Sequence, residues 1–209
     1  MAPRAATPTR ETLLAAAEGL INDQGFAATS IDQIIDRAGV TKGTFFYHFK
    51  SKNDLARALV DRYARGDQEL LHSSMERATR LADDPLQQLL IFVGLLIEVA
   101  EQLDETEQPG CLFATYCFEM SLFDDDTLRV IADGFAGWRD LVGERLRAAA
   151  ELHPPRLPVD LDSVADMLIV LFEGAFVISR STPGPGVFAA QLGAYRAFLQ
   201  LLFDAAGAA

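Results

Sequence analysis

Residues 30–49, SIDQIIDRAGVTKGTFFYHF, decide the fold of this chain, because they predict two short helices joined by a tight turn. Ser30 is expected to begin the first helix, with Gln33 three residues later completing a capping box. Gly39 supplies the turn, since glycine adopts a positive φ angle without a steric penalty. Thr41 is an N-cap candidate for the second helix. The stretch therefore predicts a helix-turn-helix.

The second helix of this pair is expected to contact DNA. Its first exposed residues, Lys42, Gly43 and Thr44, are short or flexible enough to approach base edges and phosphates. Phe45 and Phe49 lie four residues apart and are expected to pack this helix on the helices expected at 9–24 and 51–80. The residues expected to contact DNA lie at the two helix N-termini, along the second helix and just beyond it: Ser30, Thr41, Lys42, Gly43, Thr44, Tyr47, His48 and Lys52.

Other interpretations of this stretch stay open. A helix-turn-helix can be a packing unit with no DNA partner, and His48 can be an ordinary solvated residue. Asp32 and Asp36 are expected to form a solvated acidic face that keeps non-specific DNA binding weak. Under either interpretation Phe45 and Phe49 are expected in the core.

The charge is divided unevenly along the chain. The 209 residues carry a net charge of −12, which by itself argues against a nucleic-acid partner. Residues 1–65, however, carry nine basic and seven acidic side chains, whereas residues 66–209 carry nine basic and 23 acidic ones. Because DNA phosphates repel an acidic surface, any DNA contact is expected in the N-terminal part.

Composition argues against a secreted or membrane-spanning protein. Two cysteines are too few for a disulfide scaffold and indicate a reducing compartment, so the expected location is the cytoplasm. The first ten residues contain no apolar segment of the kind found in signal peptides. The longest apolar stretch, residues 164–178, contains Asp166 and Glu173 and is shorter than the roughly 20 residues that span a bilayer. No membrane partner is expected.

The patterns that mark most enzymes are missing. The sequence has no glycine-rich phosphate loop, no HExxH, no CxxC and no Gly-x-Ser-x-Gly. His48, His72 and His153 are too far apart to have the spacing of metal ligands. We therefore expect neither an enzyme, nor a cofactor, nor a metal site.

Cap and turn residues divide nearly the whole chain into helices, and no segment alternates with the period of a β-strand. Three short helices are expected in front of six others. The approximate bounds of the nine are 9–24, 30–39, 42–49, 51–80, 86–103, 111–122, 124–152, 160–180 and 187–205.

Residues 38–55, AGVTKGTFFYHFKSKNDL, resemble the TetR family of one-component transcriptional regulators, and the resemblance extends over residues 9–59. It implies an all-α, nine-helix fold with a helix-turn-helix DNA-binding domain at residues 1–52 and a ligand-binding and dimerisation domain at residues 53–209. The implied partners are a double-stranded DNA operator, a small-molecule effector and a second copy of the chain. Phe46, where many members have tyrosine, and Ile35, where many have a smaller residue, depart from the family pattern.

The last two helices are expected to form the dimer interface. Residues 162–180 and 187–203 carry apolar side chains on all sides. Neighbours within one chain of this length can cover about two sides of such a helix, so a two-fold four-helix interface would bury the rest. The alternative is that both helices lie in the core of a monomer.

An effector pocket is expected among the middle helices, because large apolar residues accumulate there and Glu119 and Glu173 lie within apolar sequence. Each aromatic residue can instead be ordinary core, and the two acids can be structural. The residues expected to line the pocket are Phe92, Phe113, Tyr116, Cys117, Met120, Phe135, Trp138, Met167, Phe172 and Glu173.

Cys111 allows two interpretations. It follows Pro109-Gly110 near a helix N-terminus, where the helix dipole favours a thiolate, so it can sense oxidants or electrophiles. The favoured interpretation is a small buried hydrophobic residue.

Together these patterns predict a repressor that a small apolar or amphipathic effector releases from a palindromic operator. The alternatives are an activator of the same family, or a small-molecule-binding or scaffold protein that no longer binds DNA.

Overall fold

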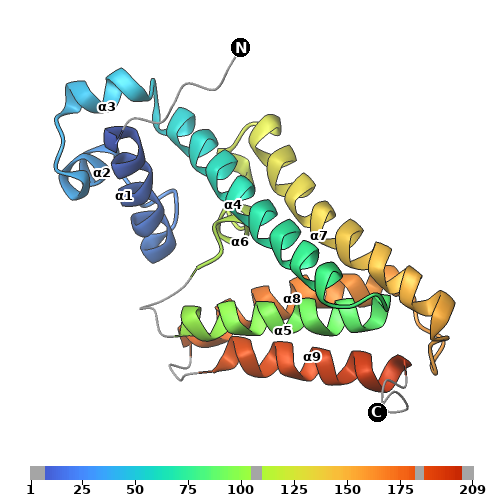
Figure 1. The fold of residues 1–209 in the computed structure, drawn as a ribbon. Coiled ribbons are helices and arrows are strands. Elements are labelled where there is room, and N and C mark those ends of the chain that lie inside the picture. The colour runs from blue at the N-terminus through green and yellow to red at the C-terminus, as the bar shows by residue number, and fades with distance from the viewer. Residues whose placement is uncertain (1–7, 105–109, 182–185, 204–209) are drawn as a thin grey trace. The chain divides into compact units, whose positions relative to one another are not determined.

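The computed structural model describes residues 8–104, 110–181 and 186–203, and over these residues it consists of nine α-helices and one short 3₁₀ helix (Figure 1). The expected all-α fold of nine helices is confirmed. The chain divides into two compact units. Unit 1 contains the described residues up to Arg65 together with Gly110–Ile131, and unit 2 contains the remainder. This division lies inside a helix rather than at the boundary expected after residue 52, and it adds a distant segment to the N-terminal unit.

Unit 1 is built on the helix-turn-helix. It comprises α1 (Pro8–Gln24), α2 (Ile31–Ala38), α3 (Lys42–His48), the first half of α4 (Lys52–Leu81), α6 (Leu112–Cys117), η1 (Met120–Leu122) and the first turns of α7 (Asp125–Leu152). The core side chains of α1 to α4 are fully or almost fully buried: Leu13, Leu14, Ala17, Ile21, Ile34, Phe45, Phe49, Leu55 and Leu59. The expectation that Phe45 and Phe49 lie in the core is confirmed.

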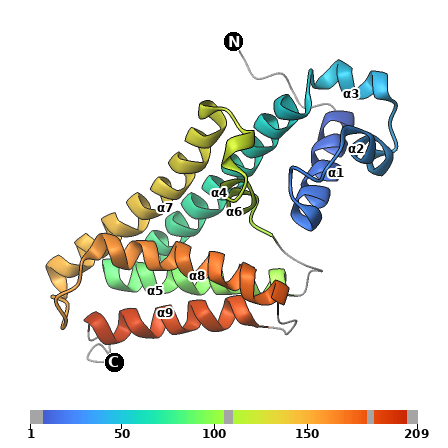
Figure 2. The same cartoon turned by 180° about the vertical axis from the view of Figure 1, so that it is seen from behind.

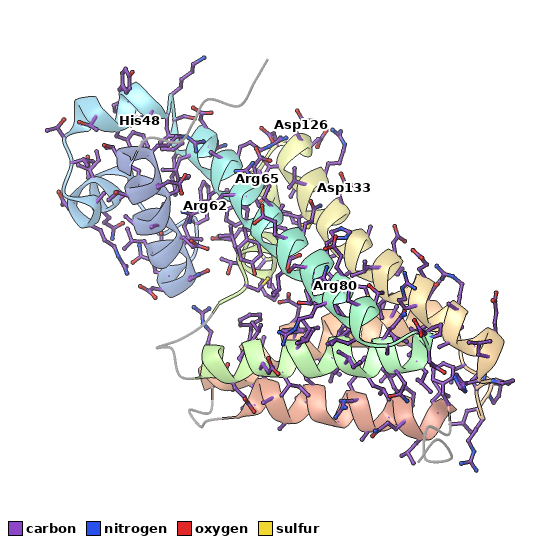
Figure 3. The ribbon with its side chains drawn as sticks, in the orientation of Figure 1. His48, Arg62, Arg65, Arg80, Asp126 and Asp133 are labelled. Atoms are coloured by element: carbon purple, nitrogen blue, oxygen red, sulfur yellow. The ribbon has the colours of Figure 1, made fainter. Side chains whose placement is uncertain are left out.

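An ion-pair cluster fastens α4 to α1. The guanidinium group of Arg62, labelled on α4 in Figure 3, donates to Glu11 at 3.1 Å and also to Glu18. Because one planar guanidinium engages two carboxylates on the same helix, it fixes the rotation of α4 against α1 as well as the distance between them.

Unit 2 is a helical bundle formed by the second half of α4, α5 (Pro85–Asp104), the rest of α7, α8 (Leu161–Ser181) and α9 (Val187–Phe203). Helix α9 lies along α5 and α8, as the opposite views of Figures 1 and 2 show. Two hydrogen bonds connect α9 to these helices. The hydroxyl of Tyr195 donates to Val164 O of α8 at 2.9 Å, and Arg196 Nε donates to Leu90 O of α5 at 2.9 Å. Among the described residues, no helix has the length and hydropathy needed to cross a membrane.

The expected helix at 111–122 is broken in the structure, which corrects the sequence prediction. Helix α6 ends at Cys117, and η1 begins only at Met120. Between them Glu119 has φ −126° and ψ 28°, outside the α-helical region. The physical reason is a tertiary contact, since the side chain of Glu119 binds backbone N–H groups after α1. The expected end of the last helix at 205 lies outside the described residues.

Candidate DNA-binding surface

The start of α2 and the turn after it have the predicted geometry. Ser30 Oγ accepts from Gln33 N at 3.1 Å, and Gln33 Oε1 accepts from Ser30 N at 2.7 Å, which completes the capping box. Gly39 has φ 66°, and its N–H donates to Asp36 O at 3.2 Å. The turn is thus fixed by local hydrogen bonds and by a residue that tolerates a left-handed backbone.

Helix α3 is fixed in the same local way. Thr41 precedes it in an extended conformation, and its Oγ1 accepts from Thr44 N at 3.2 Å. The Oγ1 atoms of Thr41 and Thr44 lie 2.9 Å apart, so the two hydroxyls are also hydrogen-bonded. Phe45 is completely buried beneath the helix, and its ring contacts that of Phe49 at 5.8 Å between centroids. One side of α3 is therefore core and leaves the other side open to a partner.

The open side of α3 carries several of the residues that sequence analysis assigned to DNA. Lys42 and Gly43 are exposed in its first turn, and Tyr47 is 75% exposed. The ring of Tyr47 packs edge-on against that of His48 at 4.9 Å, and His48 lies at the end of the helix (Figure 3). Phe46 is also half exposed. Besides Phe46, the side chains on this surface are a cation, a phenol and an imidazole, all able to donate to phosphate oxygens.

Lys42 has an ion-pair partner on α2. Its Nζ lies 3.5 Å from Asp32 Oδ1, and the two side chains are 67% and 77% exposed. An exposed pair of this kind is worth little, because water solvates both charges. Lys42 can therefore exchange Asp32 for a phosphate at small cost.

Lys52 was expected to contact DNA, but in the structure its side chain binds another part of the protein. Its ammonium group donates to the carbonyl oxygen of Phe26, lies 3.5 Å from that of Ala27, and sits 4.0 Å from the centre of the Phe26 ring. Burial lowers the pKa of Lys52, and the nearby charge of Glu119 opposes part of that change. In this conformation Lys52 binds the protein itself, so the expected phosphate contact is not preformed. No sequence pattern indicates this contact, because Phe26 and Lys52 belong to different local patterns.

The residues assigned to an effector divide between the two units. In unit 1, Phe113 and Tyr116 are buried, whereas Cys117 and Met120 are exposed. Tyr116 stacks on Phe123 with ring centroids 4.1 Å apart and is therefore packed as core. Exposure makes Cys117 and Met120 poor candidates for the wall of an enclosed pocket.

In unit 2, Phe92 and Trp138 are buried, Phe135, Phe172 and Glu173 are partly buried, and Met167 is exposed. Trp138 and Phe172 are brought together with their rings 5.3 Å apart, and Trp138 Nε1 donates to Asp67 at 2.7 Å. Trp138 and Phe172 are thus two of the predicted pocket residues that lie in direct ring contact.

A surface pocket of about 340 Å³ lies elsewhere in unit 2, between α4 and α5. Its lining consists of Ser73, Ser74, Arg77, Arg80, Leu95, Glu98 and Val99. None of these residues was assigned to an effector from the sequence.

Cys111 is buried and occupies the N-cap position of α6. Its Sγ accepts from Ala114 N at 3.5 Å and lies 3.5 Å from the hydroxyl of Tyr63. Its burial agrees with the interpretation of Cys111 as a small core residue.

Two protein-family signatures match this chain. The one described as "Bacterial regulatory proteins, tetR family" covers residues 13–59, which include the whole helix-turn-helix. The one described as "Transcriptional regulator LmrA/YxaF-like, C-terminal domain" covers residues 85–185. The chain belongs to the TetR family. It is a DNA-binding transcriptional regulator with an LmrA/YxaF-like C-terminal domain, and not an enzyme.

Relatives and solved structures agree with this assignment. An uncharacterized HTH-type transcriptional regulator in the lacX 3′ region of Lactococcus lactis subsp. lactis is 27% identical over 83% of this chain and 84% of its own length. The HTH-type transcriptional repressor DhaR of Mycobacterium sp. (strain GP1) is 24% identical over 83% of each chain. The crystal structure of a regulatory protein TetR from Rhodobacter sphaeroides superposes with a TM-score of 0.74 at 21% identity, covering 91% of this chain and 98% of that one, which shows the shared fold.

Proposed function

We propose that this TetR-family regulator is a homodimeric repressor that binds a palindromic operator through α3 and leaves it when a small apolar or amphipathic effector binds unit 2. The observation that carries the proposal is the two-sided α3, with Phe45 and Phe49 buried on one side and Lys42 and Tyr47 exposed on the other. Repression is favoured over activation by the similarity to DhaR, a repressor by name. We place the protein in the cytoplasm because its operator DNA is there.

Dimerisation through α8 and α9 is supported by apolar side chains that their own protomer leaves uncovered. Met167, Val170, Val177 and Ile178 of α8 and Leu201 of α9 are large hydrophobic residues exposed to solvent. A second copy related by two-fold symmetry would cover the same residues on both chains. Such a dimer presents two copies of α3, and its symmetry requires an operator with two inverted half-sites.

The effector would act through linkage. If it weakens DNA binding by a given factor, DNA weakens effector binding by the same factor. Trp138 and Phe172 are the best candidates for its apolar contacts in unit 2, because the structure brings them together.

The test measures binding of the DNA that flanks the gene by fluorescence anisotropy at two salt concentrations. The variant is Lys42→Ala with Tyr47→Ala, which removes side chains that are exposed in the free protein. We expect each lost base contact to cost about 1–3 kcal/mol of binding free energy. Arg80→Ala is the charge-matched control, since Arg80 is an exposed base of unit 2.

Wild-type affinity in a folded double variant would contradict the proposed role of α3. Failure of the wild-type protein to bind any flanking DNA would favour the alternative of a small-molecule-binding or scaffold protein. Transcription in vitro from the same DNA then separates a repressor from an activator by the sign of its effect.

A further inference from the structure

The loop between α1 and α2 is held by side chains from two distant parts of unit 1. The chain leaves α1 at Gly25, which has φ 85°, and reaches the N-cap of α2 at Ser30. Phe26 and Ala27 form the dipeptide directly after Gly25, and both of their backbone N–H groups donate to the carboxylate of Glu119, at 2.7 and 3.0 Å. A carboxylate that accepts from two N–H groups makes hydrogen bonds stronger than those between neutral groups.

The carbonyl groups of the same dipeptide accept hydrogen bonds from a positively charged side chain, opposite in charge to Glu119. The ammonium of Lys52, the first residue of α4, donates to Phe26 O and approaches Ala27 O at 3.5 Å. All four backbone polar groups of Phe26 and Ala27 therefore have a charged partner. We call Glu119, Lys52 and this dipeptide the 26–27 clamp.

The ring of Phe26 belongs to the same assembly. It packs against Phe123 at 4.7 Å and Tyr116 at 5.8 Å, on both sides of Glu119 in the sequence. Asn53, next to Lys52, donates from Nδ2 to Leu122 O at 3.3 Å. Residues 116–123 are thus fastened to the α1–α2 loop and to the first turn of α4 at several points.

The position of this loop determines where the first turn of α2 lies in space. Thr29 is buried and its hydroxyl donates to Gly25 O at 2.8 Å, so the loop is a rigid turn rather than a flexible tether. The turn leads directly into Ser30, whose capping box starts α2, and α2 leads through Gly39 into α3. A displacement of Phe26 and Ala27 is therefore passed to the helix-turn-helix.

We infer that Glu119 is a positioning residue for DNA binding: its carboxylate, carried by the segment 116–123, holds the α1–α2 loop in the conformation that α3 needs at the operator. This inference rests on the proposed DNA-binding role of α3. A change that withdraws Glu119 from the loop weakens operator binding although Glu119 touches no DNA. The segment 116–123 is consequently a place from which the affinity of the helix-turn-helix is controlled.

Electrostatics and the clamp predict opposite signs for Glu119→Gln. Loss of one negative charge reduces repulsion of DNA and by itself tightens binding. Loss of the carboxylate leaves an amide with one oxygen for two N–H groups, which loosens the loop and weakens binding. We expect operator affinity to fall about tenfold or more, because one lost hydrogen bond to a charged group lowers affinity by at least that factor.

Asp126→Asn is the matched control. Asp126 lies on the first turn of α7 in the same unit, pairs with Arg129 at 2.7 Å and is well exposed (Figure 3). It loses the same charge without touching the loop, so we expect unchanged or slightly tighter DNA binding. If Glu119→Gln and Asp126→Asn bind the operator equally, the inference is overturned.

Two readouts separate positioning from a general loss of stability. Amide hydrogen exchange at Phe26 and Ala27 should accelerate in Glu119→Gln while exchange in unit 2 stays as in the wild type. The slope of log affinity against log salt should not change, because no phosphate contact is lost. Affinity that falls only in proportion to the unfolded fraction would show a structural role alone and overturn the inference.

Lys52→Met tests the same clamp if Glu119→Gln does not fold. It preserves the aliphatic stem and removes the other half of the clamp, and Lys50→Met is its control, since Lys50 is exposed. We expect Lys52→Met to weaken binding with an unchanged salt slope. A slope shallower by about 0.9 per lost contact would instead make Lys52 a phosphate ligand and overturn its place in the clamp.

The order of measurement separates the two proposals. If the wild-type chain binds none of the flanking DNA, the proposed function fails, and the clamp is judged by hydrogen exchange. Unchanged exchange at Phe26 and Ala27 in Glu119→Gln then overturns the clamp as well.

Discussion

The two exposed surfaces of this regulator, on α3 and on α8–α9, differ in chemistry although each exposes large side chains. On α3 the most exposed large hydrophobic residue is Tyr47, at 75%, and Lys42 of the same helix forms an exposed ion pair with Asp32 of α2. On α8 and α9 the most exposed large hydrophobic residues are aliphatic, with Val170 at 65%, Val177 at 60% and Leu201 at 72%. The first surface suits a hydrated anionic partner, and the second suits an apolar one. The same fold thus presents one surface suited to polar contacts and another suited to apolar contacts.

The largest expected effect distinguishes the buried side of α3 from its exposed side. Phe45→Ala should lower the free energy of unfolding by about 3–5 kcal/mol, because the ring is completely buried and leaves a cavity. Tyr47→Ala on the same helix should change it by less than about 0.5 kcal/mol, as expected for an exposed site. Urea unfolding followed by circular dichroism measures both. Equal losses of unfolding free energy would show that both sides of α3 are packed in the fold, which would contradict the difference between its buried and exposed sides.

The next effect tests the apolar surface. Val177→Glu and Leu201→Glu should raise the dimer dissociation constant about thirtyfold or more, equivalent to about 2 kcal/mol, while each protomer stays folded. The reason is that a charge would be buried between two copies without a partner. Sedimentation across a dilution series measures the dissociation constant.

Leu199→Glu is the informative contrast on the same helix, because Leu199 is fully buried within its own protomer. It should unfold unit 2 rather than dissociate a folded dimer. A wild-type chain that sediments as a monomer at micromolar concentration would contradict the proposed interface.

The smallest effect concerns a carboxylate in unit 2. Burial raises the pKa of Asp67 above its usual 3.8, and the hydrogen bond from Trp138 opposes part of the rise. The folded protein therefore holds this proton more tightly than the unfolded chain, so the stabilisation is complete below pH 3.8 and is lost as pH rises through the folded pKa. Emission from Trp138, the one tryptophan of the chain, should titrate with a midpoint above 3.8. Asp67→Asn should abolish that titration, and a midpoint at or below 3.8 would contradict the predicted sign.

The N-terminal helices were predictable because their ends are determined by neighbours in the sequence. Ser30, Gly39 and Thr41 form the caps and the turn with partners no more than five residues away, so a local pattern contains all that is needed. The buried positions of Phe45 and Phe49 follow from helical spacing in the same way.

The effector residues were harder to predict. Phe113, Tyr116 and Trp138 are large and apolar in the sequence, but size does not distinguish a pocket wall from a packed core. Cys117 and Met120 are predicted beside them only because they belong to the same apolar stretch of sequence. In the structure both are exposed, and they lie on opposite sides of the break at Glu119.

The sequence by itself determined the all-helical fold, the helix-turn-helix and the family, because cap residues and hydrophobic periodicity act over a few residues. Tertiary structure decided the roles of Glu119 and Lys52, which bind a dipeptide 92 and 25 residues away in the chain. The sequence around a carboxylate or an ammonium group does not indicate which distant group will bind it. The partner is chosen only when folding brings unpaired backbone groups within hydrogen-bonding distance, since a buried group left without one costs free energy.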